Sequence, residues 1–139
     1  MRSARQGMTL IELVVMVALV AVVSTAGMLS LSRLLSGRLE AEARTMVTDL
    51  SWARSRTVAT RSQHTVVFEP DAERYTISEG GRTLGIRSLV VDLVSVTPAG
   101  DLTFTAPHGK TQSKQIALSD QGKTIRVTVF GDTGYVKND

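Results

Sequence analysis

The sequence predicts an α+β protein in which a long N-terminal helix packs on an antiparallel β-sheet. Two observations lead to this prediction. No proline occurs between Met8 and Glu69, and residues up to about Thr60 are compatible with one helix. After Thr60 the pattern changes to short β-rich runs separated by proline, glycine and aspartate turns. Consecutive short strands joined by tight turns pair antiparallel, and a sheet of this kind needs a helix to cover it.

The first part of this predicted helix is apolar on all sides. Arg2 and Arg5 precede Gly7, and the chain carries no charge from Leu13 to Ser32. About twenty helical residues span about 30 Å, the thickness of bilayer hydrocarbon. We therefore predict a leader over residues 1–7 and a transmembrane or filament-core helix over residues 8–32. The basic leader keeps the N-terminus in the cytoplasm, so the remainder lies beyond the membrane.

Glu12 is a carboxylate at the edge of this apolar run. An ionised acid in hydrocarbon costs about 3 kcal/mol, so it needs a partner. The string Gly7-Met-Thr-Leu-Ile-Glu12 resembles the class III signal of type IV pilins and type II secretion pseudopilins. The resemblance implies that a prepilin peptidase cuts after Gly7, that the new N-terminus at Met8 is methylated, and that Glu12 sets the register between subunits.

A secretory signal peptide is the alternative. It would need a small-residue cleavage site at its far end, for which Ser24–Gly27 is the only candidate that we identify. A glutamate at the start of the apolar region is not typical of such peptides, and the uncharged run is longer than one requires. These two features favour the prepilin interpretation.

The second part of the helix, residues 33–62, is predicted to be amphipathic. Apolar or small residues recur at three-and-four spacing along one face, namely Leu35, Leu39, Ala43, Met46, Leu50, Ala53 and Thr57. Charged residues occupy the other sides and include an i,i+4 pair of Glu40 and Arg44. We expect the apolar face to pack under the β-rich globular domain of residues 63–139.

Six or seven short strands are predicted in that domain. They cover His64–Glu69, Arg74–Ser78, Ser88–Val96, Leu102–Thr105, Gln115–Leu118, Thr124–Val129 and Tyr135–Val136. The residues Pro70–Glu73 are expected to form a hairpin turn, and Gly80-Gly81 a second break.

Four segments of the chain resemble the GspH/FimT family of minor pseudopilins and minor pilins. They are Ala53–Ala59, the Val66–Pro70 hairpin with Tyr75, Leu102–Phe104, and Gly131–Val136. The resemblance implies a pilin-like fold and a minor pseudopilin of a type II secretion system. Such a protein is a structural subunit of a periplasmic pseudopilus, anchored in the inner membrane, that drives export of folded proteins.

Two other functions stay open from the sequence. One is a minor pilin of a type IV pilus, acting in pilus initiation, adhesion or DNA uptake. The other is a single-pass anchored periplasmic binding domain or enzyme. The resemblance implies other pilins or pseudopilins and the prepilin peptidase as partners, with an assembly platform and an ATPase acting indirectly.

Catalytic and metal chemistry find little support in the sequence. The chain has no cysteine, which excludes disulfides and thiolate chemistry. His64 and His108 lie far apart, so we expect ordinary surface histidines, no metal and no cofactor. No nucleophile or phosphate-loop motif is present, and we predict that the protein is not an enzyme.

The sequence offers one candidate for a DNA-contacting face. Arg54, Arg56 and Arg61 lie near the predicted helix end, and Lys110 and Lys114 lie in a distant loop. Lys and Arg number 16 against 13 Asp and Glu, and two of the arginines belong to the leader. This near balance favours a solvated helix flank over nucleic-acid binding. Trp52 is expected to be a core or interface anchor rather than a base-stacking platform.

Overall fold

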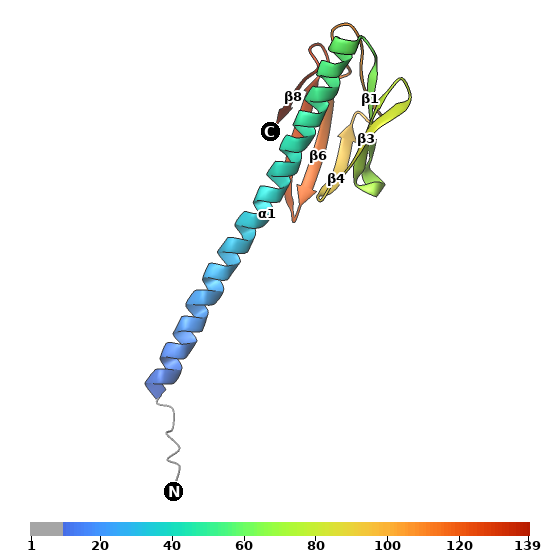
Figure 1. The fold of residues 1–139 in the computed structure, drawn as a ribbon. Helices are drawn as coiled ribbons and strands as arrows, with labels where there is room; N and C mark the ends of the chain where they lie inside the picture. Colours follow the sequence, from blue (N-terminus) through green and yellow to red (C-terminus); the bar gives the residue numbers. More distant parts are fainter. Residues whose placement is uncertain (1–9) are drawn as a thin grey trace. The chain divides into compact units, whose positions relative to one another are not determined.

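The protein has an α+β fold built from one long helix and two antiparallel sheets (Figure 1). The computed structural model describes the backbone of residues 10–139 and the side chains of residues 10–24 and 37–139. Helix α1 covers Leu10–Thr60, close to the predicted Thr9–Thr60. It ends at Thr60 because Arg61 adopts a left-handed backbone conformation, with φ 54°. The chain divides into two units, one ending at Leu34 and one covering Leu35–Asp139.

In the N-terminal unit, every described side chain is exposed. This holds for residues 10–24, most of which are apolar. Within the part of the chain that the structure describes, no helical stretch has both the length and the apolar character needed to cross a membrane. The predicted leader, and Met8 and Thr9 after it, lie outside the described residues. So do the side chains of residues 25–32, the last part of the predicted membrane segment.

The C-terminal unit contains eight described strands in two sheets of four. The first sheet has the order β3-β2-β1-β5 and the second the order β4-β6-β7-β8. The first consists of β1 (His64–Glu69), β2 (Arg74–Glu79), β3 (Arg82–Ser88) and β5 (Leu102–Phe104), with the short 3-10 helix η1 (Pro70–Ala72) between β1 and β2. The second consists of β4 (Asp92–Thr97), β6 (Lys114–Asp120), β7 (Lys123–Phe130) and β8 (Tyr135–Asn138).

The predicted strand Ser88–Val96 is confirmed only from Asp92 to Val96, which lie in β4, and is wrong before Asp92. Ser88 is the last residue of β3, and the next strand, β4, starts only at Asp92. β3 itself was not predicted, because all seven of its residues are exposed and only Leu84 and Ile86 among them are apolar, which is too few to show a strand period. The break predicted at Gly80-Gly81 is the β2–β3 hairpin turn. Both glycines there have positive φ, 55° and 88°, as a two-residue hairpin turn requires.

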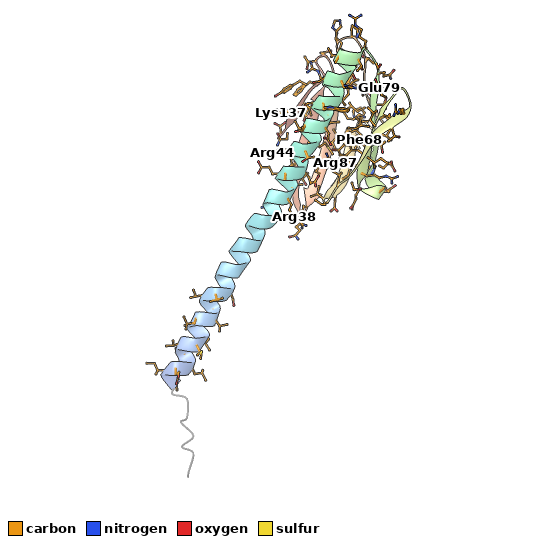
Figure 2. All side chains as sticks on the ribbon, in the orientation of Figure 1. Arg38, Arg44, Phe68, Glu79, Arg87 and Lys137 are labelled. Carbon is orange, nitrogen blue, oxygen red and sulfur yellow. The ribbon has the colours of Figure 1, made fainter. Side chains whose placement is uncertain are left out.

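The predicted helix stripe is the centre of the core. Its six described members are all buried, namely Leu39, Ala43, Met46, Leu50, Ala53 and Thr57. All of them except Thr57 belong to one hydrophobic cluster with buried side chains from both sheets, the largest being Tyr75, Phe104, Leu102, Ile116 and Leu118. Figure 1 shows the C-terminal part of α1 running along the sheets. On the opposite side of the helix, Arg44 points away from the sheets (Figure 2) and pairs with Glu40 at 2.6 Å, as predicted.

Candidate functional site

The N-terminal candidate site is described only in part. Glu12 lies in the first turn of α1 and its side chain is exposed. Gly7 and Met8, the predicted cleavage and methylation positions, lie outside the described residues. The neighbouring apolar side chains are strongly exposed, reaching 82% at Leu10 and 71% at Val23. Since exposed apolar surface of this extent marks an interaction site, these residues need a cover that the described residues of their unit do not provide.

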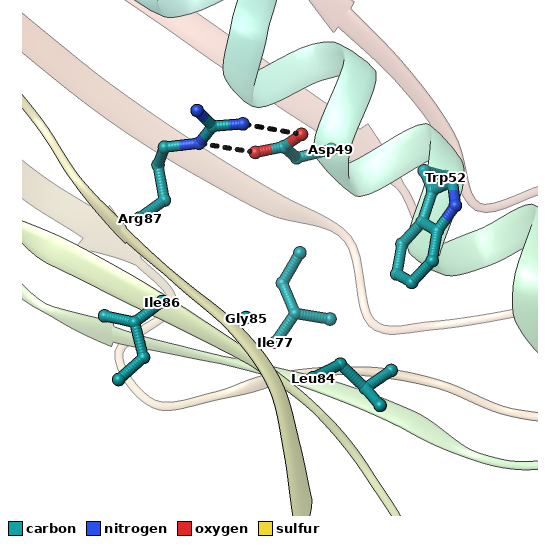
Figure 3. Close-up of a pocket in the computed structure, with 7 residues that line it drawn as sticks. All are labelled: Asp49, Trp52, Ile77, Leu84, Gly85, Ile86 and Arg87. Carbon is teal, nitrogen blue, oxygen red and sulfur yellow. Dashed lines mark hydrogen bonds and ion pairs between the residues drawn. The ribbon is translucent and has the colours of Figure 1, made fainter.

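A second candidate site is a cleft of about 240 Å³ between the helix and the edge of the first sheet (Figure 3). It is lined by Asp49 and Trp52 of α1, Ile77 of β2, and Leu84, Gly85, Ile86 and Arg87 of β3. Asp49 precedes the buried Leu50, so its carboxylate lies at the border of the helix stripe. Trp52 is 48% exposed and is therefore not a core residue, while its role as an interface anchor stays a prediction.

The charged end of this cleft is a three-residue hydrogen-bond network. The Asp49 carboxylate accepts a hydrogen bond from the Tyr75 hydroxyl at 2.6 Å and from Arg87 Nε at 3.1 Å. Burial, and next the Asp49 hydrogen bond, raise the pKa of Tyr75 well above its ordinary value. The hydrogen bond to Asp49 also raises the pKa of Arg87. Because Arg87 belongs to the edge strand, the network ties β3 to the helix.

His64 is not the surface histidine that the sequence predicted. It is fully buried, and its Nδ1 lies 3.1 Å from Thr57 Oγ1 and 3.1 Å from the Ser62 carbonyl oxygen. The Trp52 ring meets it edge-on, at 6.3 Å between centroids. The placement of Thr57 in the helix stripe was the available signal, because a polar residue on a buried face needs a nearby polar partner. His108 is exposed. The described residues contain no cluster of three or more potential metal ligands.

Lys114 also differs from its prediction as a loop residue. It lies on β6 and is 1% exposed. Its Nζ donates hydrogen bonds to the carbonyl oxygens of Pro98 at 2.6 Å and Gly100 at 3.0 Å. Burial lowers the pKa of this ammonium group. Lys114 therefore holds the loop after β4 and is not available to contact DNA.

The three arginines of the possible DNA-contact face lie in different environments. Arg54 is partly buried, and its side chain packs so closely that a Cβ at Gly134 would lie 2.9 Å from its Cδ. Arg56 and Arg61 are exposed. Arg54 and Arg56 are two residues apart in a helix and so point to different sides. A DNA-contact role for these residues stays a prediction.

Comparison with known proteins identifies the fold. No protein-family model matches the chain, and no curated protein matches it in sequence. Two crystal structures of the type IV minor pilin FimU from Pseudomonas aeruginosa strain PAO1 do match. They have TM-scores of 0.62 and 0.60 and are 17% and 18% identical to this chain. The matches cover 75% and 73% of this chain and 90% and 92% of FimU. The chain therefore has a pilin-like fold.

Proposed function

We propose that this chain is a minor subunit of a pilin-like filament that is assembled from the inner membrane. The observation that carries the proposal is the pairing of a pilin-like C-terminal unit with an N-terminal stretch, Leu10 to Ser24, whose apolar side chains are all exposed. In this proposal residues 8–32 lie first in the bilayer and then in the filament core. Residues 63–139 form the periplasmic globular domain, and the protein acts as a structural component without enzymatic activity.

Glu12 is the residue that we propose to set subunit register. Its carboxylate, in a helix surrounded by hydrocarbon or by neighbouring apolar helices, is stabilised when it pairs with a cation. The methylated amine at Met8 of a neighbouring subunit supplies that cation in the proposed filament. An assembly ATPase and a platform protein in the membrane supply the work that extracts the apolar helix from lipid.

Two kinds of filament fit this proposal. The likeness to FimU supports a minor pilin of a type IV pilus. The resemblance of the sequence to the GspH/FimT family supports a minor pseudopilin of a type II secretion system equally well. Deletion of the gene separates the two, because it would abolish surface pili in one case and the release of folded secreted proteins in the other.

Processing and incorporation of three variants test the proposal. We expect Gly7→Val to leave full-length precursor in the inner membrane, because a side chain at the cut obstructs the peptidase. We expect Glu12→Leu to be cleaved normally but to be absent from purified filaments. Glu40→Leu is the matched control, since Glu40 is an exposed glutamate of the same helix, and it should be cleaved and incorporated. Mature-size Gly7→Val protein, or normal incorporation of Glu12→Leu, would contradict the proposal.

A further inference from the structure

β3 is an edge strand whose central residues are uncharged. It ends the sheet order β3-β2-β1-β5, and among the described residues its outer side pairs with no strand. Proteins usually protect such edges with short strands, prolines or charged side chains, because free backbone N–H and C=O groups recruit other chains. β3 is seven residues long and contains no proline, and its two charged residues, Arg82 and Arg87, lie near its ends. Leu84 and Ile86 are apolar and are 39% and 62% exposed.

The cleft beside this edge is open because residue 85 has no side chain. Gly85 lies opposite the buried Ile77 in the β2–β3 register, and a Cβ built on it would meet no atom within 4 Å. Trp52 and Leu84 border the same space (Figure 3). The volume of about 240 Å³ is smaller than the ~300–1,000 Å³ of typical small-molecule sites. It is suited to a single large apolar side chain.

One basic charge at this edge is available to a partner. Arg87, near the end of β3, is already paired with the Asp49 carboxylate, 3.1 Å from its Nε. Arg82, at the start of β3, is exposed and forms no ion pair among the described residues. Glu79, opposite Arg82 in the register, lies 4.0 Å from His64 Nε2. A strand added to β3 would therefore be favoured by a carboxylate near Arg82.

We propose that β3 accepts an extended segment of a partner protein as a fifth strand of the first sheet. One apolar side chain of that segment fills the cleft between Trp52 and Gly85, and an acidic residue of the segment lies near Arg82. Backbone hydrogen bonds supply the affinity and the cleft supplies the specificity, as in other cases of strand addition. The inference stands on the geometry of the C-terminal unit and does not depend on the proposed role of Glu12.

Trp52 provides a direct reporter, because it is the only tryptophan of the chain. The full chain in detergent micelles would be titrated with the peptide acetyl-Glu-Thr-Val-Phe-Val-Thr-Glu-amide at fixed pH. We expect a saturable shift of Trp52 emission to shorter wavelength as phenylalanine covers the indole. Replacing the central phenylalanine by alanine, the two valines by proline, or both glutamates by lysine should each weaken binding about tenfold or more.

Gly85→Leu is the decisive variant. A Cβ at this position meets no atom within 4 Å, and Gly85 has no positive φ that would strain a leucine, so the leucine side chain can extend into the cleft. The matched control is Gly37→Leu on α1, where an added Cβ also meets nothing within 4 Å. We expect both variants to retain the unfolding transition, with peptide affinity about tenfold weaker in Gly85→Leu and unchanged in Gly37→Leu.

Three outcomes would overturn the inference. The first is no emission change with any peptide at millimolar concentration. The second is undiminished binding by Gly85→Leu or by the proline peptide, which would rule out cleft filling or strand addition. The third is a shift that depends on protein concentration without peptide, which would make a second copy of this chain the occupant. None of these results bears on leader cleavage or on filament incorporation of Glu12→Leu, so failure here is distinguishable from failure of the proposed function.

Discussion

Two stretches of α1 use apolar residues in opposite ways. Between Leu10 and Ser24 every side chain is exposed, whereas between Leu39 and Thr57 six residues at three-and-four spacing are fully or almost fully buried. The later stretch is apolar on one face, and side chains from the two sheets cover that face. The earlier stretch is apolar on all sides, and a helix of that kind needs surroundings on all sides. The spacing of apolar residues, rather than their number, therefore decides whether this chain can bury them itself.

A matched pair of methionine substitutions tests this contrast most strongly. Met46 is 0% exposed and Met16 is 56% exposed. We expect Met46→Asp to destabilise the C-terminal unit by about 4 kcal/mol or more, because it buries a charge that has no partner. Met16→Asp should change the unfolding of that unit by less than about 0.5 kcal/mol. Denaturant unfolding of the full chain in micelles, followed by Trp52 fluorescence, measures both.

Under the proposed function Met16→Asp should also separate folding from filament assembly. Met16→Asp would fold but fail to enter filaments, because its carboxylate would face apolar neighbours. If Met46→Asp unfolded at the same denaturant concentration as the unchanged protein, the helix stripe would not be the centre of the core.

Features that depend on local sequence could be predicted, and features that depend on contacts between distant segments could not. The helix and its stripe were predictable because helical periodicity is a local property, and most strands because they alternate or follow turn residues. β3 was missed because an exposed edge strand carries no burial pattern. His64 and Lys114 were misplaced because their burial depends on partners elsewhere in the fold, such as the carbonyl oxygens of Pro98 and Gly100 for Lys114.

The cleft could not be predicted for the same reason. Asp49 and Arg87 are 38 residues apart in sequence and meet only when the β2–β3 hairpin folds back on the helix. Nothing in the local sequence around either residue indicates the other. Gly85 gave no signal for a cleft, because a single glycine does not indicate which side chains of other elements lie opposite it.

The free energy of unfolding at alkaline pH tests whether Tyr75 stays buried and protonated in the folded protein. The pKa of Tyr75 is raised in the folded protein, and an unfolded tyrosine ionises near pH 10. Above about pH 10 the unfolded state therefore loses a proton that the folded state keeps. The free energy of unfolding should fall by about 1.4 kcal/mol per pH unit from this group, until the raised pKa is passed.

Comparison with two phenylalanine variants isolates that contribution. Tyr75→Phe should lack the alkaline decrease, and Tyr135→Phe, which changes the only other tyrosine, should retain it. Lys114 acts in the opposite direction, because its pKa is lowered by burial, but it is common to all three proteins. If Tyr135→Phe showed tyrosinate absorbance at a pH below its unfolding transition, Tyr75 would be exposed to solvent in the folded protein. Its hydrogen bond to Asp49 would then not hold.

Substitutions on the solvent-facing side of the stretch Leu39–Thr57 should change the free energy of unfolding least. Arg44 and Glu40 pair at 2.6 Å, but their side chains are 71% and 53% exposed. Water solvates both charges in the unfolded and folded states, so the pair gains little from meeting. A double-mutant cycle with Glu40→Gln and Arg44→Gln should give a coupling of about 0.3 kcal/mol at low salt. The coupling should vanish near 1 M salt, where the screening length is about 3 Å. A coupling above about 1 kcal/mol, or one insensitive to salt, would mean that the outward face is also covered. The stretch Leu39–Thr57 would then be covered on both sides, and not on its apolar face alone.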